Sequence, residues 1–216
     1  ADGGVVGRPF FLVGHSLGGL VAGRYAEAFA PDGLRGIGLV APFVDVAMDV
    51  PAWKRSLGSA ADRLVPELTM DNGLDDNQLF RREPDRTAYR DDPLVHRRIS
   101  ARLWGEMQRA SNRLVEEAPR LRVPVLMQLA GKDTVVSNAA SRVFASRLPS
   151  APRIIEYDEA FHALFHDPLA SEIFGDLRTW LAGLLDEPTG EPSRKQSPAA
   201  RGAVRASPKE PTVEEK

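Results

Sequence analysis

The sequence predicts an α/β protein with a mostly parallel sheet, flanking helices and an inserted helical segment. Three features of the pattern lead to this prediction. Short apolar runs end in glycine or proline, as in strands that are buried on both faces. Amphipathic segments with helical spacing separate these runs. A middle stretch then breaks the alternation with helical patterns alone.

The opening of the chain predicts a strand, a helix and a second strand. Residues 9–13 are an apolar run that ends in glycine, and residues 17–30 have near-helical spacing before the breaker Pro31-Asp32-Gly33. Residues 36–41 are a second apolar run that ends at Pro42. This order is that of a βαβ unit.

The middle of the chain is predicted to be a helical cap over the sheet. Amphipathic patterns from Trp53 to Leu64 and from Ile99 to Val115 predict two helices. A polar, irregular stretch separates them at residues 71–93, and no strand-like alternation is visible in the cap.

Strand and helix alternate again after the cap, and a polar tail follows. The predicted elements are a strand at 123–131, a helix at 138–148, a strand at 153–157 and a helix at 169–185. The tail carries only two large apolar residues, Val204 and Val213, and is predicted to be disordered. The predicted organisation is core 1–46, cap 47–118, core 119–186 and tail 187–216.

Composition excludes several classes of function. The chain has 216 residues, a formal net charge of −2 and no cysteine, so disulfides and thiolate metal sites are impossible and no basic field indicates nucleic acid. No metal or nucleotide motif is present, so no cofactor is expected. Asp71, Asp75 and Asp76 lack the glutamate and spacing of a calcium loop and are predicted to lie in a solvated loop. We expect a cytoplasmic location.

A single serine stands between two glycines where the first predicted strand meets the first helix. Gly14-His15-Ser16-Leu17-Gly18 matches G-x-S-x-G, in which a tight turn needs neighbours without side chains and lifts the serine hydroxyl clear of the sheet. The Leu17 N–H then lies at a helix N-terminus and can donate to an oxyanion. A plain glycine turn with Ser16 as a helix cap is the alternative.

A serine nucleophile needs a base and an orienting acid, in the chain order serine, acid, histidine. Asp133 follows one predicted strand and His162 follows the next, as this order requires. Asp45 also follows a strand and is an alternative acid. Asp133 has an alternative function as a helix N-cap.

The other histidines are weaker candidates for the base. His166 would face solvent or the neighbouring Asp167 carboxylate if the last helix began early. His15 is expected to pack and hydrogen-bond beside the nucleophile, and His96 is expected to lie on the cap surface.

These motifs together resemble a known family. The runs "PFFLVGHSLGGLVAGRYA", "LVAPFVDV", "YRDDPLVHRRISARLWGEM", "LRVPVLMQLAGKDTVV" and "EYDEAFHALFHD" are similar to the α/β-hydrolases of the monoacylglycerol lipase and lysophospholipase group, also called serine aminopeptidase-like. The resemblance covers Pro9 to about Leu185. It implies Ser16 as nucleophile, Asp133 as acid, His162 as base and Leu17 as oxyanion donor, without a cofactor.

The implied reaction is hydrolysis of a carboxylic ester of a small lipid through an acyl-enzyme, under a cap that covers an acyl channel. The implied partner is a small acyl-ester substrate, with transient membrane-surface contact through the cap and no obligate protein partner. An amide or peptide hydrolase is the alternative, with Asp91 and Asp92 as candidates to hold an ammonium group. A peracid substrate and a non-catalytic remnant also stay open.

The family has several strands and an oxyanion loop before the nucleophile, whereas only a short piece precedes Pro9 here. The resemblance therefore predicts an N-terminally truncated form that lacks the early strands. Such a form is expected to be weak or inactive by itself, because it would lack a second oxyanion donor.

Overall fold

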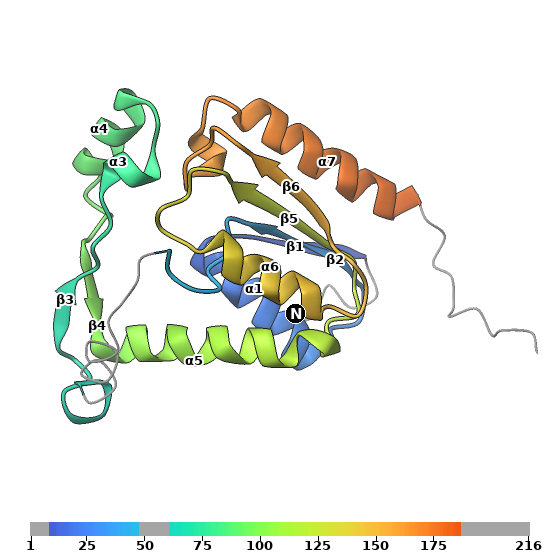
Figure 1. Cartoon of the computed structure of the whole chain (residues 1–216), viewed down its shortest axis with the longest axis horizontal. Helices are drawn as coiled ribbons and strands as arrows, with labels where there is room; N and C mark the ends of the chain where they lie inside the picture. The colour runs from blue at the N-terminus through green and yellow to red at the C-terminus, as the bar shows by residue number, and fades with distance from the viewer. Residues whose placement is uncertain (1–8, 48–60, 187–216) are drawn as a thin grey trace, which may run out of the picture. The chain divides into compact units, whose positions relative to one another are not determined.

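A four-stranded parallel sheet organises the protein. The computed structural model describes residues 9–47 and 61–186. The strands lie in the order β1 (Phe10–His15), β2 (Leu34–Val40), β5 (Val125–Ala130) and β6 (Arg153–Tyr157), and each neighbouring pair is parallel (Figure 1). Because all four strands run the same way, their carboxyl ends meet at one edge of the sheet.

Helices cover both faces of this sheet. Figure 1 shows α1 (Leu17–Phe29) and α6 (Asn138–Arg147) on one face and α7 (Ala170–Asp186) on the other. The long helix α5 (Ala101–Glu117) packs against α1. The central strands supply fully buried side chains to the core, among them Ile37, Leu39, Met127 and Leu129.

Serine hydroxyls begin two of these helices. Ser100 accepts a hydrogen bond from the backbone N–H of Leu103 at the start of α5, and Ser137 accepts one from Ala140 at the start of α6. Each bond satisfies one of the amides that a helix leaves without a partner in its first turn. Two short 3₁₀ helices, η1 (Ala118–Arg120) and η2 (Leu164–His166), complete the core.

The predicted alternation of strands and helices in the core is confirmed, but the prediction of a purely helical cap is wrong. Two short strands, β3 (Thr69–Asp71) and β4 (Arg98–Ser100), pair as an antiparallel ribbon. Helices α3 (Asp76–Leu79) and α4 (Glu83–Asp91) lie between them. The strands are three residues long, which is too short to show alternation of apolar and polar residues. Helix α4 buries no residue, so its sequence shows no apolar face.

The prediction of a solvated loop is wrong for Asp76. This residue is buried at 6% exposure and lies 3.4 Å from Arg90 Nη1, in an ion pair between α3 and α4. Asp75 is the N-cap of α3 and accepts a hydrogen bond from Asn77. Asp71 accepts the Gly73 N–H at 2.7 Å, so these acids shape the chain locally.

Some predictions fall on residues that the structure does not describe. The predicted helix from Trp53 to Leu64 lies mostly outside the described residues, and residues 61–64 at its end are helical. The tail after residue 186 lies outside them as well, and the domain boundaries stay a prediction. In the described part of the chain no helix has the length and apolar character needed to cross a bilayer.

Arg24 joins α1 to α5 and also pairs with a buried carboxyl group on its own helix. Arg24 Nη1 on α1 lies 2.7 Å from Glu27 Oε2 and 3.2 Å from Glu117 Oε2 on α5. The Glu27 side chain is fully buried, and its Oε1 has no hydrogen-bond partner among the described residues. Burial raises the pKa of Glu27 from its ordinary 4.5 to about 7, although the Arg24 hydrogen bond opposes this shift.

We expect Glu27 to make stability depend on pH. Between pH 4.5 and 7 the folded protein holds a proton that the unfolded chain has released, so the free energy of unfolding falls as pH rises through this window. The fall attributable to Glu27 is at most about 3 kcal/mol. Urea unfolding of the wild type and of Glu27→Gln at several pH values measures it. Parallel pH profiles for the two proteins would contradict the assignment.

Candidate active site

Ser16 occupies a strained turn between β1 and α1. Its φ is 53° and its ψ is −120°, a conformation that residues with a side chain rarely adopt. Backbone hydrogen bonds hold the residue there: its N–H donates to the Val40 carbonyl at 2.9 Å, and its carbonyl accepts the Gly19 and Phe43 amides, both at 2.9 Å. These three backbone hydrogen bonds offset the strain of the turn.

The glycines of the motif are not equivalent. A Cβ on Gly14 would lie 2.2 Å from the Gly18 carbonyl oxygen, so the turn closes only over a residue without a side chain. A Cβ on Gly18 would meet nothing within 4 Å of the described chain. The expectation that the turn needs glycine at both positions is therefore wrong for Gly18, because the helix carries that Cβ position away from the strand.

His162 joins the predicted nucleophile to the predicted acid. Its Nε2 lies 2.9 Å from Ser16 Oγ, and its Nδ1 lies 2.8 Å from Asp133 Oδ2. A carboxylate can only accept, so Nδ1–H donates to Asp133 and Nε2 is left to accept the Ser16 hydroxyl proton. His162 is 3% exposed, so this hydrogen-bond chain lies out of bulk water.

Asp133 accepts hydrogen bonds through both of its carboxyl oxygens. Its Oδ1 accepts the backbone amides of Val135 and Val136, both at 2.9 Å, and its side chain is fully buried. The N-cap of α6 is Ser137, so Asp133 does not have the alternative function of capping that helix. Asp45 accepts the N–H of Val46 at 2.8 Å and has no described contact with His162.

His15 packs against His162, as expected from its position. Its Nε2 donates to the His162 backbone carbonyl at 2.9 Å, and the two ring centroids are 5.0 Å apart. Burial, the largest influence, lowers the pKa of His15 and favours its neutral form. His166 instead contacts the Phe80 ring edge-on at 5.8 Å and lies in η2, before α7 begins.

Ser16 and His162 line a cavity of about 290 Å³ together with residues of β4 and α5. Its walls are mostly apolar. The apolar lining residues are Leu17, Phe43, Val46, Leu74, Ile99, Leu103, Trp104, Met107 and Val135. Such walls suit a hydrocarbon chain next to the nucleophile.

The polar part of the lining was missed by sequence reasoning. Asn72, Gln78, His96, Arg98 and Thr134 line the cavity, and no described carboxylate does. His96 is exposed, as predicted for a cap surface residue, but it also faces this cavity. No local signal could have placed His96 or Arg98 here, because their position depends on the β3–β4 pairing.

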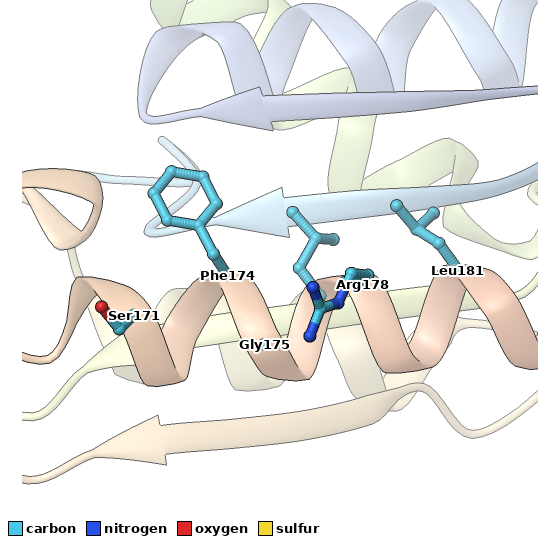
Figure 2. A pocket seen from close by; sticks show the side chains of 6 residues that line it. Ser171, Phe174, Gly175, Arg178 and Leu181 are labelled. Atoms are coloured by element: carbon cyan, nitrogen blue, oxygen red, sulfur yellow. The ribbon is translucent and has the colours of Figure 1, made fainter.

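A second apolar hollow lies along α7. Figure 2 shows Phe174 and Leu181 pointing from the same side of this helix, with Ser171 and Arg178 as the polar groups of the lining. No histidine or carboxylate lines it, so Ser171 has no base there. The described residues also contain no cluster of three or more metal-ligating side chains.

The family model for serine aminopeptidase, S33, matches residues 4–169 of the chain. The chain belongs to this family. The chain is similar to the crystal structure of monoacylglycerol lipase from Paleococcus ferrophilus, with 33% sequence identity and a TM-score of 0.77. The match covers 83% of this chain and 70% of that one. The predicted α/β-hydrolase fold is therefore confirmed.

Two curated relatives show how far the similarity extends. Phospholipase YtpA of Bacillus subtilis is 26% identical over 80% of this chain and 67% of its own length. Monoglyceride lipase of Homo sapiens is 25% identical over 82% of this chain. The chain spans 59% of the human protein's length.

We expect the two glycines of the motif to respond oppositely to alanine. Gly14→Ala forces a methyl group against the Gly18 backbone and lowers the free energy of unfolding by at least about 3 kcal/mol. Gly18→Ala places its methyl group in open space on a helix and raises that free energy by up to about 1 kcal/mol. Chemical denaturation measures both, and a fully stable Gly14→Ala protein would contradict the packing argument.

Proposed function

We propose that this protein is a serine hydrolase that cleaves carboxylic esters of small lipids. The observation that carries the proposal is the hydrogen-bond chain from Ser16 through His162 to Asp133, which opens into an apolar cavity. The family and the lipase and phospholipase relatives support the same reaction class.

In the proposed reaction Ser16 Oγ attacks the ester carbonyl while His162 Nε2 takes its proton. Asp133 stabilises the imidazolium that forms. The Leu17 N–H, in the first turn of α1 and without an intrahelical partner, donates to the oxyanion. The tetrahedral intermediate collapses, His162 returns the proton to the departing alcohol, and water then releases the acid from the acyl-enzyme.

The cavity favours a single-chain ester over the alternative substrates. Its volume of about 290 Å³ is at the lower end of small-molecule sites, which leaves little room for several acyl chains. An aminopeptidase would need a carboxylate to hold the substrate ammonium group. Asp91 and Asp92 are exposed and do not line the cavity, so the described residues give less support to the peptide hydrolase.

The expectation of weak activity by itself stays a prediction. Leu17 is the one oxyanion donor that we assign, and loss of a single donor lowers kcat by about 10²–10³ in another hydrolase. The proposal concerns the type of reaction at this site and not its rate.

The cap also supports the predicted contact with lipid surfaces. Large apolar side chains are exposed near the start of β3. They are Leu64 at 79%, Val65 at 49%, Leu68 at 51% and Met70 at 42%. We call these four residues the cap patch and propose that it docks transiently on a lipid surface that supplies the substrate.

Removing two leucines of the cap patch is expected to weaken vesicle binding. Leu64→Ser with Leu68→Ser removes apolar area that a bilayer would cover, so the partition constant onto phosphatidylcholine vesicles falls at least about tenfold. Sedimentation with vesicles measures it. Val143→Ser, which removes a half-exposed apolar residue of α6, is the control. Equal loss in both proteins would argue against docking through the cap.

A fluorophosphonate probe tests the proposed nucleophile and acid together. We expect labelling to vanish in Ser16→Ala and to slow by at least about 100-fold in Asp133→Asn, because asparagine favours the wrong tautomer of His162. Asp45→Asn removes the alternative acid and is the matched control, with labelling expected to be unchanged. If the folded wild type is not labelled, the protein is a non-catalytic remnant; if Asp45→Asn is the slow variant, the acid is misassigned.

A further inference from the structure

The cavity beside Ser16 has an unbalanced positive charge. Arg98 lines it from β4, and His96 lines it from the segment before that strand. No aspartate or glutamate among the described residues shares the lining. A ligand in this cavity therefore lies beside Arg98 and His96, with no carboxylate in the described lining.

Arg98 differs from most arginines around it. Six neighbours in the same part of the chain form ion pairs with carboxylates, namely Arg81, Arg82, Arg86, Arg90, Arg102 and Arg109. Within the described residues Arg98 forms no ion pair. Its cross-strand neighbour Asp71 accepts the Gly73 amide at 2.7 Å and does not line the cavity.

Arg98 is nevertheless held in place. Its Nε donates to Thr69 Oγ1 and its Nη2 donates to the Thr69 carbonyl, both at 2.8 Å. These bonds leave the Nη1 hydrogens without a described acceptor. A guanidinium group that is fixed on one side loses little conformational entropy when it binds an anion on the other.

His96 adds an imidazole at the same wall. Its Nδ1 lies 3.1 Å from the Arg98 backbone carbonyl, which can only accept, so Nδ1–H donates. Nε2 is left for a ligand. A protonated phosphate oxygen can donate to this Nε2, which is how His96 would assist Arg98.

We propose that Arg98, assisted by His96, selects substrates whose headgroup carries a phosphate. This proposal rests on the proposed function and names its substrate class: a monoacyl glycerol phosphate ester, with its carbonyl at Ser16 and its phosphate at Arg98. The planar guanidinium group matches phosphate oxygens in charge and geometry, whereas an uncharged glycerol leaves that charge unpaired.

A matched pair of substrates tests the selection. Octanoylglycerol and octanoylglycerol phosphate share one acyl chain and differ only in the phosphate, and both are used below their micelle concentrations. We expect the wild type to prefer the phosphate ester in kcat/KM by about 10- to 100-fold, the usual contribution of charged hydrogen bonds. Arg98→Gln is expected to remove this preference, mainly by raising KM for the phosphate ester.

Arg97→Gln is the matched control, because it removes the same charge from the adjacent residue, which does not line the cavity. This variant keeps the preference if the contact is specific. Equal loss in both variants would show a general electrostatic effect and overturn the assignment. Arg98→Gln that lowers kcat/KM equally for both esters would show a structural contribution instead and would overturn it too.

Binding provides a readout that does not need turnover. In Ser16→Ala, calorimetry compares octyl ethers of glycerol and glycerol phosphate, which cannot be hydrolysed. Tighter binding of the phosphate ether that disappears in Ser16→Ala with Arg98→Gln supports the proposal. Equal binding of the two ethers overturns it. If the neutral ester is hydrolysed through Ser16 without any phosphate preference, the proposed function stands and this inference fails; if neither ester is hydrolysed, the proposed function fails.

Discussion

The imidazole of His162 is the link on which the site depends. Its two nitrogens bind groups that are 146 and 29 residues away along the chain, Ser16 and Asp133. They can meet because parallel strands end at one edge of the sheet, so the loops after β1, β5 and β6 share one rim. The sheet therefore supplies the positional order that a flexible chain would have to gain at a large entropic cost.

The turn at Ser16 shows how that order is maintained locally. A positive φ at a residue with a side chain is unfavourable, and backbone bonds from β2 and the loop after it offset it. Close approach of the Gly18 carbonyl to Gly14 completes the turn. His15 then ties the strand end to the His162 backbone through a hydrogen bond, which connects the residue before the nucleophile to the proposed base.

The cavity has an apolar part and a positively charged part. These two parts would bind the tail and the headgroup of a lipid substrate, respectively. Apolar side chains from the core and α5 surround the nucleophile, while the β3–β4 ribbon contributes a fixed guanidinium group. The lack of any described carboxylate in the lining gives this small space a definite sign of charge. An ester with an apolar tail and an anionic headgroup fits that arrangement better than a substrate with an ammonium group.

The sequence by itself determined the fold class, most strand and helix positions in the core, and the three side chains of the proposed site. These follow from local patterns: β6 occupies the predicted residues 153–157, and Ser16 lies in a motif that its own neighbours define. Only the tertiary structure decided that Asp76 is buried, that Gly18 is sterically free, and that Arg98 lines the same cavity as Ser16. Each of these depends on contacts between segments that are distant in the sequence. The three-residue strands of the ribbon are too short to show a hydrophobic pattern from which their pairing could be predicted.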